Sequence, residues 1–253
     1  MRRAAIALWI AGCGFSARSE PARDARDGID GQTGDASRDA RADAPGDAAQ
    51  LPAPALVQAI TASANNSNQP LTAVLSAMPA SGDLLVMIGA AEHGGLSSVS
   101  GGGVTAWTRA TRALANTNIE VWYGITDGSS SQVTITFPAY GLPMWMVVGE
   151  WSNMATTNLL DMALSTSGTT SPAGAGSITT SSAREIVIFG VGDQTPNTFG
   201  APQGAWASLP TVTSNATVQS VWWQDLTAGA TVAPTVTETH HSWDAAIAAF
   251  RAR

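Results

Sequence analysis

Residues 79–88 read Pro-Ala-Ser-Gly-Asp-Leu-Leu-Val-Met-Ile, a turn followed by a short run of apolar side chains. Proline, serine, glycine and aspartate favour turns. Successive side chains of a strand point to opposite faces, so a run that is apolar at every position predicts a strand buried on both faces. Residues 186–189 repeat this pattern. Both segments are therefore predicted to be central strands of a two-sheet antiparallel β-sandwich.

The rest of residues 55–253 shows the same alternation of short apolar runs with clusters of Gly, Ser, Thr, Asn and Pro. No stretch has a long helical period, so the fold is predicted to be all-β. The alanine-rich segment 244–251 favours a closing strand, with a short helix as the alternative. The predicted strands lie near residues 56–62, 71–75, 84–90, 106–110, 119–125, 133–137, 145–151, 184–191, 219–223 and 246–250.

One of these strands has a clear inside and outside. Val133, Ile135 and Phe137 alternate with Thr134 and Thr136. Because the side-chain period of a strand is two residues, the apolar set is expected to face the core and the threonines to face water.

The first thirteen residues indicate where the protein works. Arg2 and Arg3 precede the apolar run 4–10, which is too short to span a bilayer, since a spanning helix needs about 20 residues. The run ends in Ile-Ala-Gly-Cys at residues 10–13, which resembles the lipobox of bacterial lipoproteins. This resemblance implies a signal peptide at residues 1–12 and acylation, for example with palmitate, at Cys13.

Cys13 is also the sole cysteine, so no intramolecular disulfide can form. Two alternatives are an ordinary cleaved signal and a cytoplasmic protein with an apolar start. The preferred prediction is a protein anchored in the membrane of the cell envelope through its N-terminal lipid. Gly14, rather than an aspartate, follows the cysteine. This resembles the sorting pattern of many Gram-negative lipoproteins and implies the outer membrane.

Residues 13–54 are predicted to be a disordered tether between the lipid and the folded domain. From Gly14 onward their composition is dominated by Asp, Arg, Ala, Gly and Pro, with almost no large aliphatic side chains. Such a segment cannot bury enough apolar surface to offset the entropy of ordering. The domain boundaries are therefore expected at residues 12 and 54, with the β-sandwich at residues 55–253.

The order of segments in this domain resembles an uncharacterised β-sandwich module of bacterial secreted proteins and phage structural proteins. The resemblance implies a jelly-roll-like fold and a surface setting, with no activity attached. It rests on Ser-Gly-Asp-Leu-Leu-Val at 81–86, Gly-rich residues before Trp107, Glu-Val-Trp-Tyr at 120–123, Val-Gly-Glu-Trp-Ser-Asn at 148–153 and Ser-Trp-Asp-Ala-Ala-Ile-Ala-Ala-Phe at 242–250.

The charge of the domain argues against nucleic acid as a partner. Residues 55–253 contain eleven carboxylates and five arginines, and the chain has no lysine. Affinity for nucleic acid comes largely from neutralising phosphates with basic side chains. We therefore expect no nucleic-acid binding.

Metal ligands and catalytic groups are sparse. Glu238, His240, His241 and Asp244 form the densest set of metal-binding side chains, but adjacent histidines in a strand point apart, which favours a polar loop. The carboxylates suited to calcium, Asp83, Asp127 and Asp193, do not form a dense array. We expect no metal and no cofactor.

A catalytic site is equally hard to assemble from the sequence. The chain lacks a Gly-x-Ser-x-Gly elbow, and no serine has an identifiable base partner. Glu150 and Asp161 are the pair of carboxylates that a glycosidase would need, but their spacing says nothing about their distance in space. The sequence therefore predicts a protein without enzymatic activity, with a hydrolase as the remote alternative.

Eight tryptophans fall within the domain, and tryptophan rings can stack on sugars when they are exposed. Most are expected to pack in the core, where large rings contribute much of the buried area. Trp206 and one of the neighbours Trp222 and Trp223 are the candidates for a surface site. The sequence thus predicts an envelope-displayed binding or adhesion module for a glycan or an envelope protein, with a purely structural envelope module as the alternative.

Overall fold

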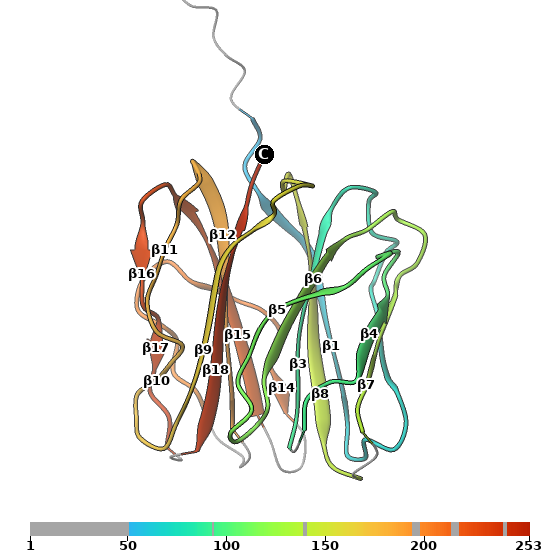
Figure 1. Ribbon diagram of the computed structural model, residues 1–253, viewed down its shortest axis with the longest axis vertical. Coiled ribbons are helices and arrows are strands. Elements are labelled where there is room, and N and C mark those ends of the chain that lie inside the picture. The colour runs from blue at the N-terminus through green and yellow to red at the C-terminus, as the bar shows by residue number, and fades with distance from the viewer. Residues whose placement is uncertain (1–50, 93, 139–140, 194–197, 214–217, 240–241) are drawn as a thin grey trace, which may run out of the picture. The chain divides into compact units, whose positions relative to one another are not determined.

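The computed structural model describes residues 51–92, 94–138, 141–193, 198–213, 218–239 and 242–253 (Figure 1). All of them belong to one unit of the chain, Ala49–Arg253. The predicted signal peptide, Cys13 and nearly all of the tether lie outside the described residues, as do His93, His240 and His241. All elements of regular secondary structure in the described part are β-strands. No helix among these residues is long and apolar enough to cross a membrane.

The first half of the domain forms a five-stranded antiparallel sheet covered by a three-stranded one. The larger sheet has the order β1 (Ala55–Ala64), β8 (Met144–Ser152), β3 (Leu84–Ala91), β6 (Glu120–Ile125) and β5 (Thr108–Arg112). The smaller sheet has the order β2 (Leu71–Val74), β7 (Gln132–Thr136) and β4 (Ser98–Gly101).

The second half forms a six-stranded sheet with narrow strand pairs outside it. The large sheet has the order β13 (Ala207–Ser208), β15 (Val218–Thr227), β12 (Arg184–Asp193), β18 (Trp243–Arg251) and β9 (Leu160–Gly168), and β14 (Val212–Thr213) pairs with β15. The outer pairs are β10 (Ala173–Gly174) with β17 (Thr235–Val236) and β11 (Ile178–Thr179) with β16 (Thr231–Val232).

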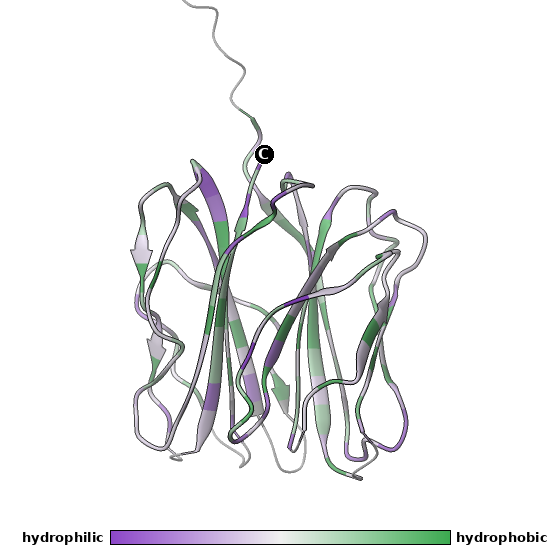
Figure 2. Cartoon of the chain, in the orientation of Figure 1, coloured by the Kyte–Doolittle hydropathy of each residue, from purple (hydrophilic) through white to green (hydrophobic). Residues whose placement is uncertain are grey.

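Three hydrophobic clusters hold these layers together. The two large sheets face each other across the first cluster, in which Val86 packs in the same core as Ile188 and Phe250. The second cluster joins the five-stranded sheet to the three-stranded sheet, and the third joins the six-stranded sheet to the outer pairs. Figure 2 shows hydrophobic residues along the strands of the large sheets, and Figure 1 shows the layers side by side. The central strands are therefore buried on both faces.

The main sequence predictions are confirmed. The fold is an all-β sandwich, β3 and β12 are central strands, and the alanine-rich last segment is the strand β18. The side chains of residues 133–137 alternate between buried and half-buried as expected. The sequence did not predict β4, β9 or the short strands β10, β11, β13, β14, β16 and β17. Most of these are short or rich in Ser, Thr, Gly and Ala, so they lack the apolar run that marks the central strands.

The two halves repeat one jelly-roll-like topology. In the first half the order β1-β8-β3-β6 places the first strand beside the last, the last beside the third and the third beside the sixth. The order β9-β18-β12-β15 in the second half follows the same plan. The corresponding strands β6 and β15 contain Val-Trp-Tyr at 121–123 and Val-Trp-Trp at 221–223. The domain is therefore an internal duplication whose large sheets pack face to face.

Candidate ligand-binding cleft

The neighbouring tryptophans of β15 point to opposite faces of the six-stranded sheet. Trp222 lies on the outer face, is only 5 % exposed and stacks on Phe189 with ring centroids 5.8 Å apart. Trp223 is half-buried in the cluster between the large sheets, where its ring meets the ring of Trp151 edge-on at 6.2 Å. Trp222 has almost no ring surface left for a ligand, and Trp223 belongs to the inter-sheet core.

Trp206 occupies a different position, directly before the edge strand β13. Its ring is half-buried against the outer cluster and contacts Phe189 edge-on, with centroids 6.1 Å apart. The rest of the ring borders an open cleft of about 410 Å³. This volume is in the range of pockets that hold a small ligand.

The cleft lies on the outer side of the six-stranded sheet. Residues 203–206 line it on one side and residues 230–234 on the other, while β15 contributes two side chains. None of the described residues that line it is ionisable; they are Gln203, Gly204, Trp206, Gln224, Leu226, Ala230, Thr231, Val232, Ala233 and Pro234. An aromatic ring beside amides and a hydroxyl therefore offers a neutral surface to a neutral ligand.

Gln224 is the polar group that distinguishes this cleft from an incidental surface hollow. The residue is 9 % exposed, and its amide makes no hydrogen bond within the described part of the chain and borders the open cleft. A ligand in the cleft could therefore bond to this amide without breaking an existing hydrogen bond of the protein.

Glu150, one of the two carboxylates predicted for a hydrolase, lies in a buried polar contact. Its carboxylate accepts hydrogen bonds from Gln58 Nε2 at 2.5 Å and from the Ala80 N–H at 2.9 Å. It also contacts Asp83, where burial and the neighbouring Glu150 raise the pKa of Asp83 to about 6, against the opposing charge of Arg253. Glu150 and Asp83 thus form a carboxyl pair at one end of the five-stranded sheet.

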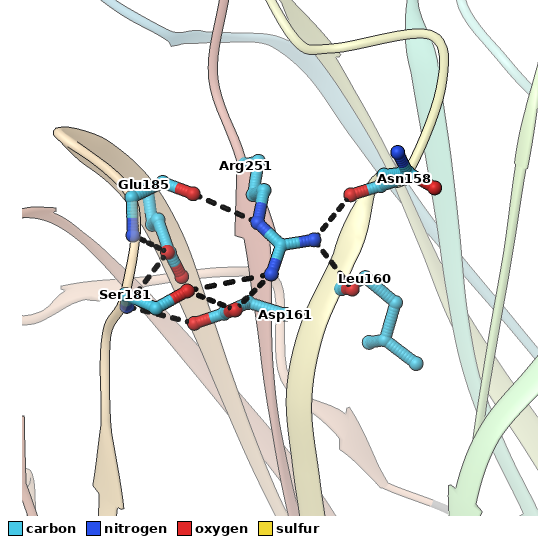
Figure 3. A network of polar contacts seen from close by, with 7 residues as sticks. Asn158, Leu160, Asp161, Ser181, Glu185 and Arg251 are labelled. Carbon is cyan, nitrogen blue, oxygen red and sulfur yellow. Dashed lines mark hydrogen bonds and ion pairs between the residues drawn. The ribbon is translucent and has the colours of Figure 1, made fainter.

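Asp161, the other predicted carboxylate, belongs to a separate network around Arg251 (Figure 3). Arg251 donates to Asp161, to Asn158 O at 2.6 Å and to Leu160 O at 3.2 Å, and the Ser181 hydroxyl also donates to Asp161. Burial disfavours the ionised Asp161, but the bonds from Ser181 and the charge of Arg251 outweigh it and lower the pKa of this carboxyl. The two carboxylates therefore lie in different networks on different sheets.

Buried Glu185 completes the network of Arg251. Its carboxylate accepts from the N–H groups of Ser181 and Ser182, at 3.1 and 2.7 Å. Burial raises the pKa of Glu185, the N–H of Ser182 opposes this rise, and the adjacent Asp161 adds to it. Both large sheets thus carry a pair of neighbouring carboxyl groups.

The predicted metal candidates are dispersed in the described part of the chain. Asp244 is fully buried and uses Oδ2 to accept three backbone N–H groups, while Asp127 bonds to the N–H of Ser129 in an exposed turn. Glu238 and Asp193 are buried. No three His, Cys, Asp or Glu side chains gather among the described residues, and His240 and His241 fall outside them.

Sequence reasoning identified Trp206 but missed Gln224. A glutamine after Val-Trp-Trp carries no signal for binding, because its significance depends on the missing hydrogen bond, which only the packing around it reveals.

No family model matches this chain, and neither a curated protein nor a solved structure matches it. The resemblance of residues 10–13 to the lipobox and that of the domain to the secreted and phage module both stay predictions.

Proposed function

We propose that this protein is a lipid-anchored component of the bacterial cell envelope that displays a non-catalytic β-sandwich for binding a neutral partner in the cleft of Trp206 and Gln224. The anchor rests on the first thirteen residues, where two arginines, a short apolar run and the Ile-Ala-Gly-Cys ending precede Cys13. More than one acyl chain is needed for stable attachment, which lipoprotein modification of Cys13 would supply.

The single observation that supports the binding role is the amide of Gln224. It makes no hydrogen bond among the described residues and lines a cleft whose wall is the half-exposed ring of Trp206. A polar group that is open to an apolar-walled cleft can fix the orientation of a ligand. The neutral lining suits recognition without acid or base chemistry.

Intact-mass analysis of membranes from the native host tests the anchor. The wild type is expected to begin at Cys13 and to be heavier than its peptide mass by the acyl chains. The Cys13→Ser variant is expected to lack this added mass and to leave the membrane fraction. A wild-type chain that still starts at Met1 without modification contradicts the anchor.

Arrays of neutral oligosaccharides and uncharged peptides, probed with the full-length protein, test the binding site. Trp206→Ala and Gln224→Leu should weaken the same hits, because the first removes the ring and the second removes the amide at similar volume. Gln132→Leu changes an exposed glutamine of β7 and is the matched control. The binding site is wrong if no ligand is retained, or if every retained ligand binds both cleft variants as it binds the control.

A further inference from the structure

The duplication allows the cleft to be compared with the equivalent place in the first half. There β7 is flanked on both sides, by β2 and by β4. In the second half the equivalent strands β16 and β17 pair only with β11 and β10 among the described strands. The cleft of Trp206 lies along β16, since residues 230–234 line it. The second half therefore lacks a counterpart of β4 where the cleft is open.

Chain length explains why this strand is missing. Ser97 N donates to Thr136 O beside the end of β7, and Gly200 N donates to Thr237 O just past the end of β17, so Ser97 and Gly200 are equivalent. Nine residues then separate Ser97 from Trp107, but only five separate Gly200 from Trp206. The difference is four residues, and β4 is 4 residues long. The second half has too little chain to form the strand.

The tryptophans at the ends of these segments are equivalent as well. Thr108 follows Trp107 and pairs with Tyr123, the third residue of Val-Trp-Tyr in β6. Ala207 follows Trp206 and pairs with Trp223, the third residue of Val-Trp-Trp in β15. Trp107 Nε1 donates to Gly101 O of β4 at 3.1 Å. Trp206 Nε1 has no acceptor in the described part of the chain. The group missing opposite Trp206 thus corresponds to a backbone carbonyl.

Gln224 also differs from its counterpart in the first half. Its counterpart is Gly124, the residue that follows the repeated Val-Trp-Tyr, and a side chain there would collide with Val104. The chain just after β4 therefore covers this position in the first half. In the second half Gln224 stands at the equivalent position and lines the open cleft.

The backbone of β16 also offers an edge. Ala230 O accepts from Thr180 N on the β11 side at 3.0 Å. Because backbone groups alternate between the two sides of a strand, the N–H and C=O of Thr231 point the other way, toward the cleft. Pro234 has no N–H, so it limits the length of any ladder formed on this edge.

We infer that the cleft binds an extended, uncharged peptide segment of a partner protein, which adds to the edge of β16 in the place that β4 occupies in the first half. This inference rests on the proposed binding function and names its ligand class. A backbone carbonyl of the peptide accepts from Trp206 Nε1, its backbone pairs with Thr231, and Gln224 bonds to a second peptide group. Strand addition to an exposed sheet edge is an established mode of peptide recognition.

The first half supplies the probe. A synthetic peptide with the sequence of residues 96–104, Leu-Ser-Ser-Val-Ser-Gly-Gly-Gly-Val, with blocked ends, is titrated into the full-length protein by calorimetry. Saturable one-to-one binding is expected. The same peptide with N-methylated backbone amides keeps its side chains but cannot donate to a ladder, so it should not bind.

Matched variants locate the binding. Trp206→Phe keeps an aromatic ring and removes the N–H donor, which should weaken the peptide about 3- to 10-fold, the usual range for one hydrogen bond. Trp107→Phe makes the same change where β4 already occupies the site, and should leave the affinity unchanged. Replacing residues 201–205 with the nine residues 98–106 gives the second half its own strand and should abolish peptide binding. If this replacement does not fold, the two tryptophan variants decide.

The outcomes separate this inference from the proposed function. Absence of peptide binding, equal binding of the N-methylated peptide, or equal loss in Trp206→Phe and Trp107→Phe overturns strand addition. Neutral oligosaccharides that bind and are lost in Trp206→Phe would make the cleft a sugar site, which overturns the peptide and leaves the binding function intact. Self-association that disappears in the strand replacement would make a second copy of the chain the occupant and overturn a separate partner.

Discussion

The carboxyl group of Asp83 lies beside that of Glu150, although the two residues are 67 positions apart in the chain. Asp83 directly precedes β3, and Glu150 lies near the end of the adjacent β8. One proton between two carboxylates removes their repulsion, so the pair is stable when Asp83 is protonated. The free energy of unfolding therefore depends on the protonation of Asp83 and hence on pH.

Stability should fall as the pH rises through about 6. The pKa of Asp83 is about 6 in the folded protein and 3.8 in its ordinary state. The folded state therefore holds a proton that the unfolded state releases between these values. Its contribution is complete below the lower value and is lost above the higher one. Asp83→Asn mimics the protonated form, so it should raise the unfolding free energy at pH 8 by roughly 1 kcal/mol and change it little at pH 4.

Urea unfolding at the two pH values measures this effect. Asp127→Asn is the control, because Asp127 is exposed and bonds to Ser129 in a turn. Equal pH dependence of the two variants would contradict a shared proton at Asp83.

Asp244 organises the loop before β6. Its Oδ2 accepts from the N–H groups of Asn116, Thr117 and Asn118 at 2.9, 2.7 and 2.7 Å, in a fully buried position. Hydrogen bonds to a charged group are worth about 1.5–3 kcal/mol each, and the N–H groups would lose their acceptor. Asp244→Ala should therefore lower the unfolding free energy by about 3 kcal/mol or more.

Thermal and chemical unfolding check this prediction against Asp225→Ala. Asp225 pairs with Arg184 at the surface, and surface ion pairs contribute about 0–1 kcal/mol. A loss at Asp244 no larger than the loss at Asp225 would show that the loop does not depend on the carboxylate.

These buried carboxylates mark the limit of what the sequence could predict. The central strands were predictable because runs such as residues 84–88 are apolar at every position, which requires burial on both faces. The buried positions of Asp244 and Glu185 were not predictable, because an acid becomes stable in a core only through N–H groups that other loops provide.

The duplication was missed because the halves share a strand order and only a few residues, such as Val-Trp at 121–122 and 221–222. The open cleft depends on four residues of missing chain, which matter only once the halves are aligned in space.

Arg251 should be far more important for stability than Arg184. Arg251 bonds to two backbone carbonyls, to Asp161 and to the hydroxyl of Ser182 (Figure 3). Arg184, by contrast, bonds to the exposed Asp225. Removing Arg251 leaves the largely buried Asp161 without its cation. Arg251→Ala is expected to cost about 2–4 kcal/mol, and Arg184→Ala less than about 1 kcal/mol.

Urea unfolding of the two arginine variants at pH 7 gives the comparison. Arg251→Lys tests geometry, because an ammonium cannot reach all the acceptors that the guanidinium fork reaches. Retention of wild-type stability by Arg251→Lys would mean that charge alone accounts for the role of Arg251.

Trp222 and Trp206 should separate stability from binding, although both contact Phe189 on the outer face of the six-stranded sheet. Trp222 is buried and stacked on that ring, so Trp222→Ala leaves a large cavity and should cost about 3–5 kcal/mol. Trp206 is half-exposed, and Trp206→Phe keeps most of its contact, so the cost should stay below about 1 kcal/mol. Denaturation midpoints of both variants measure these costs. A Trp206→Phe protein as unstable as Trp222→Ala would mean that this ring supports the core, and loss of ligand in that variant would then no longer report on the cleft.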